Sequence, residues 1–216
     1  VMIIDSADDM NVEAANALLK SLEEPPEKTL MLLISHNPGR LLATIRSRCR
    51  RLNLKPVDDE TVEKILRQAY PDLSDEDARS LTVLADGSPG KALELAANGG
   101  NDLFESWLSL FSAFPDFSIP SLYDFSDKVL KDKEKLKTVQ ELMLIRLTKA
   151  AIQAASGQTY HFVGDEEQIT KKITSLIPVL KLMDIIDEIR SDFSDIYLDQ
   201  KQVFVNACLK LQRGTK

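Results

Sequence analysis

Two short apolar runs near the start of the chain predict strands. Residues 1–4 read Val-Met-Ile-Ile and residues 30–34 read Leu-Met-Leu-Leu-Ile, and polar residues follow each run. Continuous apolar runs of this length are typical of strands buried in a parallel sheet. Between them, helical spacing begins after Asn11, a suitable N-cap, and the helix must end at Pro25-Pro26. The pattern therefore predicts strand, helix, strand.

The next residues extend this alternation. The pattern predicts a short helix over 40–45 and a third strand over 51–54. Strands that alternate with helices indicate an α/β layer with a parallel sheet. A buried strand needs neighbours on both sides, so we expect the natural protein to continue upstream of residue 1 and this sequence to be a fragment.

No further strand-like run follows Lys55, and helical spacing takes over near residue 56. Three short helices are expected up to residue 100. Ser74 starts the second with a capping-box-like pattern, and Gly87 can end it. Ser88 and the proline after it suit the N-cap and first turn of the third helix.

The remainder of the chain is also helical. Apolar residues recur at helical spacing over residues 102–114, 121–156, 166–194 with an interruption at Pro178, and 199–212. This pattern predicts a bundle of four to six helices. The Leu, Met and aromatic stripes are typical of a hydrophobic core rather than of a cofactor site.

The composition fits a folded protein of two or three small modules. Of the 216 residues, 44% are hydrophobic and 28% are charged. The net charge of -7 argues against tight autonomous binding to DNA, because that affinity comes largely from Lys and Arg neutralising phosphates. One basic cluster, defined by Arg46, Arg48, Arg50 and Arg51, leaves local or shared DNA contact open.

Cysteine usage and hydropathy suggest a cytoplasmic protein. Cys49 and Cys208 lie far apart without a CxxC pairing, so neither a disulfide framework nor a zinc site is indicated. No stretch reaches the roughly 18 uninterrupted apolar residues that a membrane span needs, and the N-terminal residues lack a signal-peptide pattern. We therefore expect reduced thiols and no membrane partner.

Three segments in fixed order resemble a known family. Residues 1–10, VMIIDSADDM, resemble the Walker B strand of AAA+ ATPases, residues 16–26, NALLKSLEEPP, resemble the clamp-loader segment that follows it, and residues 42–49, LATIRSRC, resemble the Ser-Arg-Cys motif. Together they cover about the first 55 residues and resemble the clamp-loader subunits of bacterial DNA polymerase III.

The resemblance implies a fold in three parts. Residues 1–55 are expected to be the C-terminal part of an α/β AAA+ domain with a P-loop-type parallel sheet. Residues 56–100 are expected to be an all-α, three-helix lid, and residues 101–216 an all-α helical collar that mediates oligomerisation. The lid and collar match this family in their order and size more than in their amino-acid sequence.

The resemblance implies that Arg48 is an arginine finger, which reaches across a subunit interface into a neighbour's ATP site. A fixed guanidinium there neutralises charge that grows on the phosphate in the transition state. Ser47 and Cys49 are expected to position the turn rather than to react, because no base partner is indicated. The alternative is a surface arginine or one that contacts DNA phosphate.

The Walker B segment departs from the pattern of hydrolysing members. Those place a Glu directly after the Walker B Asp, but here Ser6 follows Asp5, so the general base is missing. Asp5 alone could hold magnesium in principle. We interpret Asp8 and Asp9 as a solvated helix entry rather than as a substitute base.

The sensor positions also depart. ATPases of this family carry a motif similar to Gly-Ser-x-Arg-x-Ala-Leu in the lid, whose arginine senses the nucleotide phosphate. This chain reads GSPGKAL over 87–93, so Gly90 stands at the position of that arginine. Lys91 would point about 100° away on a helix. At the first sensor position His36 and Asn37 are polar candidates, although an ordinary turn explains them equally well. With these departures the chain resembles the delta-prime family of clamp-loader subunits.

A GxxxxGK[ST] phosphate-binding loop and the family's zinc insert would both precede residue 1 and cannot be judged. The resemblance implies no cofactor in this fragment, with ATP and magnesium bound by partner subunits. It implies a subunit without intrinsic ATPase or polymerase activity. Expected partners are the gamma or tau and delta subunits and, through the complex, the sliding clamp and primer-template DNA. The alternative is an ATP-hydrolysing gamma/tau-type subunit or another AAA+ ATPase.

Overall fold

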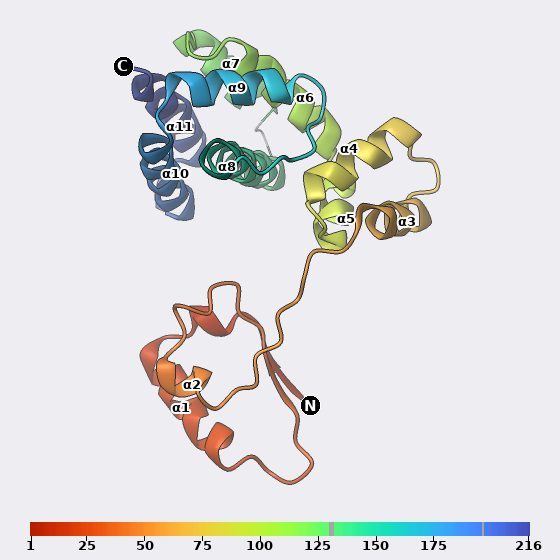
Figure 1. Ribbon diagram of the computed structural model, residues 1–216, viewed down its shortest axis with the longest axis vertical. Coiled ribbons are helices and arrows are strands. Elements are labelled where there is room, and N and C mark those ends of the chain that lie inside the picture. Colours follow the sequence, from red (N-terminus) through yellow and green to blue (C-terminus); the bar gives the residue numbers. More distant parts are fainter. Residues whose placement is uncertain (130–131, 196) are drawn as a thin grey trace. The chain divides into compact units, whose positions relative to one another are not determined.

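The computed structural model describes residues 1–129, 132–195 and 197–216 and contains two compact units, Val1–Lys55 and Pro56–Lys216 (Figure 1). The division follows Lys55, where strand-like patterns give way to helical ones. Each unit has its own secondary structure and is described separately.

The first unit is a small α/β segment. Its elements are β1 (Met2–Ile4), a 3-10 turn (Ala7–Asp9), α1 (Val12–Glu23), β2 (Met31–Leu33) and α2 (Ala43–Arg46). The strands pair in parallel, with Met2 opposite Met31. The Asn11 side chain accepts a hydrogen bond from the Ala14 N–H at 2.8 Å, and α1 ends before Pro25. These features confirm the predicted strand, helix, strand order.

Three details of this unit were predicted wrongly. Residues 51–54 form no strand, because no neighbouring strand pairs with them, and Leu54 is 88% exposed. The helix expected from residue 40 begins at Ala43, after a turn that includes Gly39. The strands are not buried either: Ile3 is 62% exposed, because two strands and two short helices do not cover both faces of the sheet.

The second unit begins with three short helices, α3 (Asp59–Ala69), α4 (Asp75–Ala85) and α5 (Pro89–Ala97). Ser74 caps α4 by accepting the N–H of Asp77 at 3.0 Å, as the capping-box pattern predicts. Between α4 and α5, Gly87 has a φ of +74°, and a Cβ there would lie 2.5 Å from the Cβ of Pro56. Only glycine suits this close, left-handed turn.

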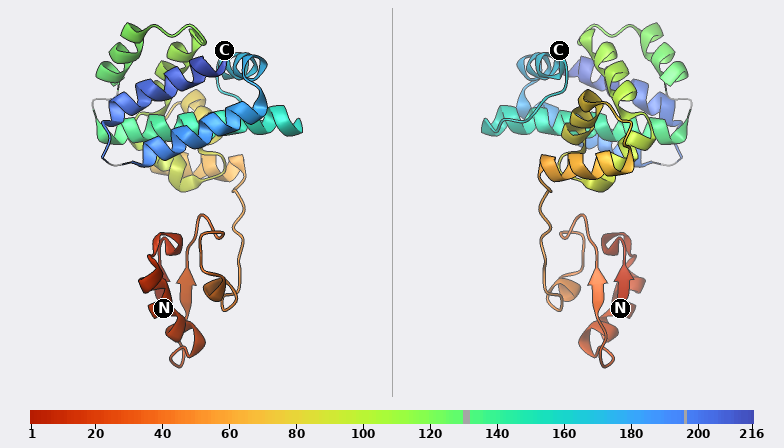
Figure 2. Two further views of the ribbon diagram at one scale, coloured as in Figure 1. Left: turned by 90° about the vertical axis from the view of Figure 1, so that its left-hand side faces the viewer. Right: turned by 90° about the vertical axis from the view of Figure 1, so that its right-hand side faces the viewer.

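Six further helices follow in the described part of the chain: α6 (Gly100–Ser112), α7 (Ile119–Val129), α8 (Lys133–Ser156), α9 (Glu166–Leu176), α10 (Val179–Ser194) and α11 (Gln200–Gly214). The longest, α8, contacts α6, α9, α10 and α11 and runs beside α10 in Figure 2. Pro178 separates α9 from α10, as predicted. The helical bundle is therefore confirmed at the upper end of the expected count.

One hydrophobic core runs through the whole second unit. It extends from Val62 of α3 to Leu211 of α11 and includes a stack of Phe104, Trp107 and Phe111. The Trp107 and Phe111 ring centroids lie 4.2 Å apart. The helices α3–α5 and the bundle thus share apolar packing, and a division between lid and collar at residue 100 stays a prediction.

Polar contacts reinforce this packing. Lys149 of α8 pairs with Asp86, which follows α4, at 2.6 Å, and Lys91 of α5 pairs with Glu141 of α8. Charged side chains of α8 therefore join the bundle to α5 and to the end of α4.

Candidate functional site

Arg48 lies in a tight turn at the end of α2. Its backbone N–H donates to the carbonyl of Ile45 at 3.0 Å, and the buried side chain of Ile45 anchors this turn. The guanidinium donates through Nη1 to the carbonyl of Thr44 at 2.9 Å and pairs through Nη2 with the Glu23 carboxylate at 2.5 Å. The side chain remains 35% exposed. Arg48 is therefore held by its own chain, while about a third of its side chain stays exposed.

The two residues beside Arg48 shape this turn. Ser47 Oγ donates to the Thr44 carbonyl at 3.0 Å and accepts from Arg48 Nη1 at 3.4 Å. Cys49 is half-buried, and burial raises the pKa of its thiol, which reduces the thiolate fraction that a nucleophile needs. The Ser47 contacts agree with a positioning role for that residue, and the raised pKa agrees with an unreactive Cys49; the positioning role of both stays a prediction.

The other members of the basic cluster, Arg46, Arg50 and Arg51, are exposed. Arg51 Nε donates to Asn53 Oδ1 at 2.7 Å. Among the four arginines, Arg48 is thus the one whose guanidinium is joined to both helices of the first unit.

The carboxyl ends of the two strands form a second polar region. Asp5 follows β1 and is exposed, and Ser6 precedes the 3-10 turn without a side-chain capping bond. The Asp8 carboxylate accepts hydrogen bonds from the backbone N–H groups of His36 at 3.2 Å and Asn37 at 3.0 Å. Asp8 therefore ties the loop after β2 to the turn after β1.

This contact changes the interpretation of Asp8. Desolvation raises the pKa of its carboxyl group, but hydrogen bonds from the backbone N–H groups, including that of Asn37, lower it more, so the pKa lies below its ordinary value. A carboxylate held in this way is a weak base. The prediction of a merely solvated Asp8 missed its partners, although parallel strands bring their carboxyl ends to one edge of a sheet.

Comparison with known proteins gives the family. Residues 1–58 match the family model described as DNA polymerase III, delta subunit. The DNA polymerase III subunit delta' of Pseudomonas aeruginosa is 46% identical over 99 residues, which are 46% of this chain and 30% of that protein. The subunit delta' of Haemophilus influenzae is 30% identical over 202 residues, which are 91% of this chain and 59% of that protein.

The chain belongs to the DNA polymerase III delta-prime family. It is also similar to the DNA polymerase III subunit tau of Bacillus subtilis, with 31% identity over 155 residues, which are 66% of this chain and 27% of that protein. The chain spans less than two thirds of the length of these relatives.

In this member of the delta-prime family, Gly90 is the exposed second residue of α5. A Cβ at this position would meet nothing within 4 Å, so the position has room for a side chain. The adjacent Lys91 Nζ pairs with Glu94 at 3.1 Å and with Glu141 of α8. Lys91 is therefore committed to a contact within the second unit.

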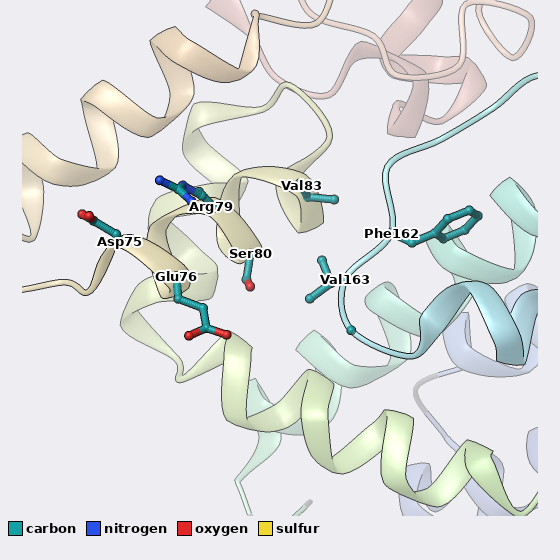
Figure 3. Close-up of a pocket in the computed structure, with 8 residues that line it drawn as sticks. Asp75, Glu76, Arg79, Ser80, Val83, Phe162 and Val163 are labelled. Atoms are coloured by element: carbon teal, nitrogen blue, oxygen red, sulfur yellow. The ribbon is translucent and has the colours of Figure 1, made fainter.

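The second unit also carries a shallow pocket of about 540 Å³ (Figure 3). It lies between α4 and the loop before α9, and its lining residues are Asp75, Glu76, Arg79, Ser80, Val83, Phe162, Val163 and Gly164. None of the site residues expected from the sequence lines it.

Two searches of the described residues give negative findings. No group of three or more His, Cys, Asp and Glu side chains is arranged to hold a metal ion in the described ranges. Within the same part of the chain, no helix combines the length and hydropathy needed to cross a membrane.

Proposed function

We propose that this chain is a non-hydrolysing clamp-loader subunit that supplies Arg48 to the ATP site of a neighbouring subunit. The observation that carries the proposal is that the chain combines Arg48, whose guanidinium is held in place and partly exposed, with Ser6, which stands where a hydrolysing subunit has its Glu. The chain retains the residue that acts on a neighbour and lacks one that its own site needs.

Arg48 suits phosphoryl-transfer chemistry. A guanidinium is permanently charged and presents a planar set of N–H donors to phosphate oxygens. During ATP hydrolysis negative charge is redistributed on the γ-phosphate and the leaving oxygen. An arginine held opposite this charge raises the rate by about 10³- to 10⁵-fold.

Two positions argue against hydrolysis by the chain itself. The Ser6 hydroxyl is neutral and cannot orient and deprotonate a water molecule as a carboxylate does. Gly90 provides no cation for a nucleotide phosphate, and Lys91 is paired with acidic groups. We infer that ATP and magnesium are bound by partner subunits.

The same proposal assigns the parts of the chain. The first unit is part of an AAA+ domain, helices α3–α5 are its lid, and α6–α11 form the collar that joins neighbouring subunits. The partners are gamma or tau and delta subunits, with the sliding clamp and primer-template DNA reached through the complex. The subunit delta' and subunit tau relatives support this assignment.

A variant of Arg48 tests the proposal in a reconstituted complex that contains the full-length protein. Arg48→Ala is expected to reduce DNA-stimulated ATP hydrolysis while leaving assembly intact, because residues 56–216 are unchanged. Arg50→Ala is the matched control, since it removes an exposed arginine from the same cluster. Equal hydrolysis by all three complexes would refute the finger role, and failure of Arg48→Ala to assemble would indicate a structural arginine.

The similarity to subunit tau of Bacillus subtilis supports a second candidate, an ATP-hydrolysing subunit. Calorimetry of the full-length protein alone separates the two functions. The delta-prime proposal predicts no ATP turnover by the isolated protein. Micromolar, magnesium-dependent ATP binding together with turnover would establish the second candidate.

A further inference from the structure

The shortest contact of the Arg48 side chain is the one with Glu23 at 2.5 Å, and this contact suggests how Arg48 is controlled. We propose that Glu23 is a holding residue, which keeps the Arg48 guanidinium folded back until an anion on a neighbouring subunit replaces the Glu23 carboxylate. This inference rests on the proposed function of Arg48 and adds a residue that regulates it.

The geometry defines a held-back guanidinium. Glu23 is the last residue of α1, and Arg48 follows α2, a helix that α1 contacts. The Glu23 carboxylate pairs with Arg48 Nη2 at 2.5 Å. Arg48 Nη1 donates a hydrogen bond to the carbonyl of Thr44, one turn earlier, at 2.9 Å. Both terminal nitrogens are thus engaged by groups of the first unit, so the side chain lies along its own turn rather than extending from it.

The charge of Glu23 makes this arrangement inhibitory. A carboxylate at hydrogen-bond distance neutralises the guanidinium and repels an approaching phosphate. An anion can therefore bind productively to Arg48 only when the carboxylate moves away. Arg48 would act as a finger only after this exchange of partners.

The exposure of the pair makes the exchange possible. The side chains are 35% and 51% exposed for Arg48 and Glu23, and ion pairs this accessible to water are weak. A phosphate carries more charge than a carboxylate and accepts two parallel N–H bonds from a guanidinium. Correct placement of a neighbour's nucleotide is therefore sufficient to release Arg48 from Glu23.

The first experiment measures the accessibility of Arg48 in the full-length protein without using ATP hydrolysis. Arginine residues are modified with phenylglyoxal, and the rate at Arg48 is followed by peptide mass spectrometry, with Arg50 as an internal reference. Glu23→Ala is expected to raise the rate at Arg48 about two- to fivefold, as for loss of a weak exposed pair. Glu24→Ala is the matched control. An unchanged rate in Glu23→Ala overturns the inference.

The second experiment measures basal ATP hydrolysis by the reconstituted complex without clamp or DNA. Glu23→Ala is expected to raise basal turnover about two- to fivefold, whereas Glu24→Ala is not. Combining Glu23→Ala with Arg48→Ala must remove this increase. Lower turnover in Glu23→Ala would overturn the inference, because Glu23 would then position the finger rather than restrain it.

The two experiments separate the inference from the function on which it rests. If Arg48→Ala alone leaves hydrolysis unchanged, the proposed function fails, and the holding role fails with it even when the modification rate shows the contact. If Arg48→Ala reduces hydrolysis but Glu23→Ala changes neither readout, the finger role stands and only the holding role is overturned.

Discussion

Arg48 and Asp8 are each fixed by groups from a distant part of the first unit. Arg48 pairs with Glu23 at the end of α1. The Asp8 carboxylate accepts hydrogen bonds from the backbone N–H groups of His36 and Asn37 in the loop after β2. The motifs predicted a functional role for Arg48, which stays a prediction, and none for Asp8. They could not indicate these partners, because each contact depends on how two separate elements pack.

The lowered pKa of Asp8 predicts a pH-dependent loop. A carboxyl group with a lower pKa when folded stabilises the fold above its unfolded pKa, near 3.8, and this stabilisation is lost as the pH falls through the folded pKa. The amide resonance of Asn37, which donates to Asp8, is therefore expected to shift as the pH falls below about 4. Asp8→Ala should produce this shift at neutral pH, while Asp9→Ala, its exposed neighbour, should not.

Two glycines near the α4–α5 turn give opposite predictions. Gly90→Ala should raise the free energy of unfolding by about 0.5 to 1 kcal/mol, because the site is helical and open. Gly87→Ala should lower it by about 1 to 3 kcal/mol, since the φ of +74° and the close Pro56 both oppose a side chain. Urea denaturation measures both values. Destabilisation by Gly90→Ala would contradict this prediction and would show that the fold requires glycine at position 90.

At the scale of helices and strands, local signals predicted the start of two helices correctly. Asn11 and Ser74 act within one helical turn, and both cap the helix that the pattern assigned to them. The expected strand over 51–54 failed because a strand requires a hydrogen-bonded neighbour, which local sequence does not specify. The predicted burial of β1 failed for a similar reason, since burial depends on the layers that cover a sheet.

A buried ion pair between α8 and α9 was not predicted, because its partners lie far apart in the sequence. Arg146 Nε lies 3.2 Å from the Glu166 carboxylate, and both side chains are almost fully buried. Burial lowers the pKa of Arg146 and raises that of Glu166, while each charge partly counteracts the shift of the other. The Arg146 guanidinium also donates to the Val83 carbonyl of α4 at 3.4 Å.

Removing one partner of this pair should be more damaging than replacing both. Arg146→Met leaves Glu166 as a buried, uncompensated carboxylate and is expected to lower the free energy of unfolding by about 3 to 5 kcal/mol. Arg146→Met combined with Glu166→Leu should recover much of this loss, because apolar groups then fill the site. Denaturation of the two variants provides the test, and equal loss in both would show that the charges are not coupled.

At the scale of the whole molecule, the two units differ in how much of their structure local patterns predicted. The helices of Pro56–Lys216 were predicted from long apolar stripes, whereas the core that α3–α5 share with the bundle was not. In Val1–Lys55 the motifs located Arg48 but not its contact with Glu23. The departures at Ser6 in this unit and at Gly90 in the second unit were recognised only as missing side chains. Neighbouring subunits, DNA and a cytoplasmic location stay predictions, because they depend on molecules outside this chain.

The most direct test isolates the ATP site next to this chain. In a reconstituted complex whose other ATP sites are inactivated, single-site hydrolysis is measured with wild-type full-length protein and with Arg48→Ala. We expect the variant to reduce the rate at least about 100-fold with little change in ATP affinity, because a finger acts mainly on the transition state. Unchanged single-site hydrolysis in an assembled complex would contradict the proposed role of Arg48.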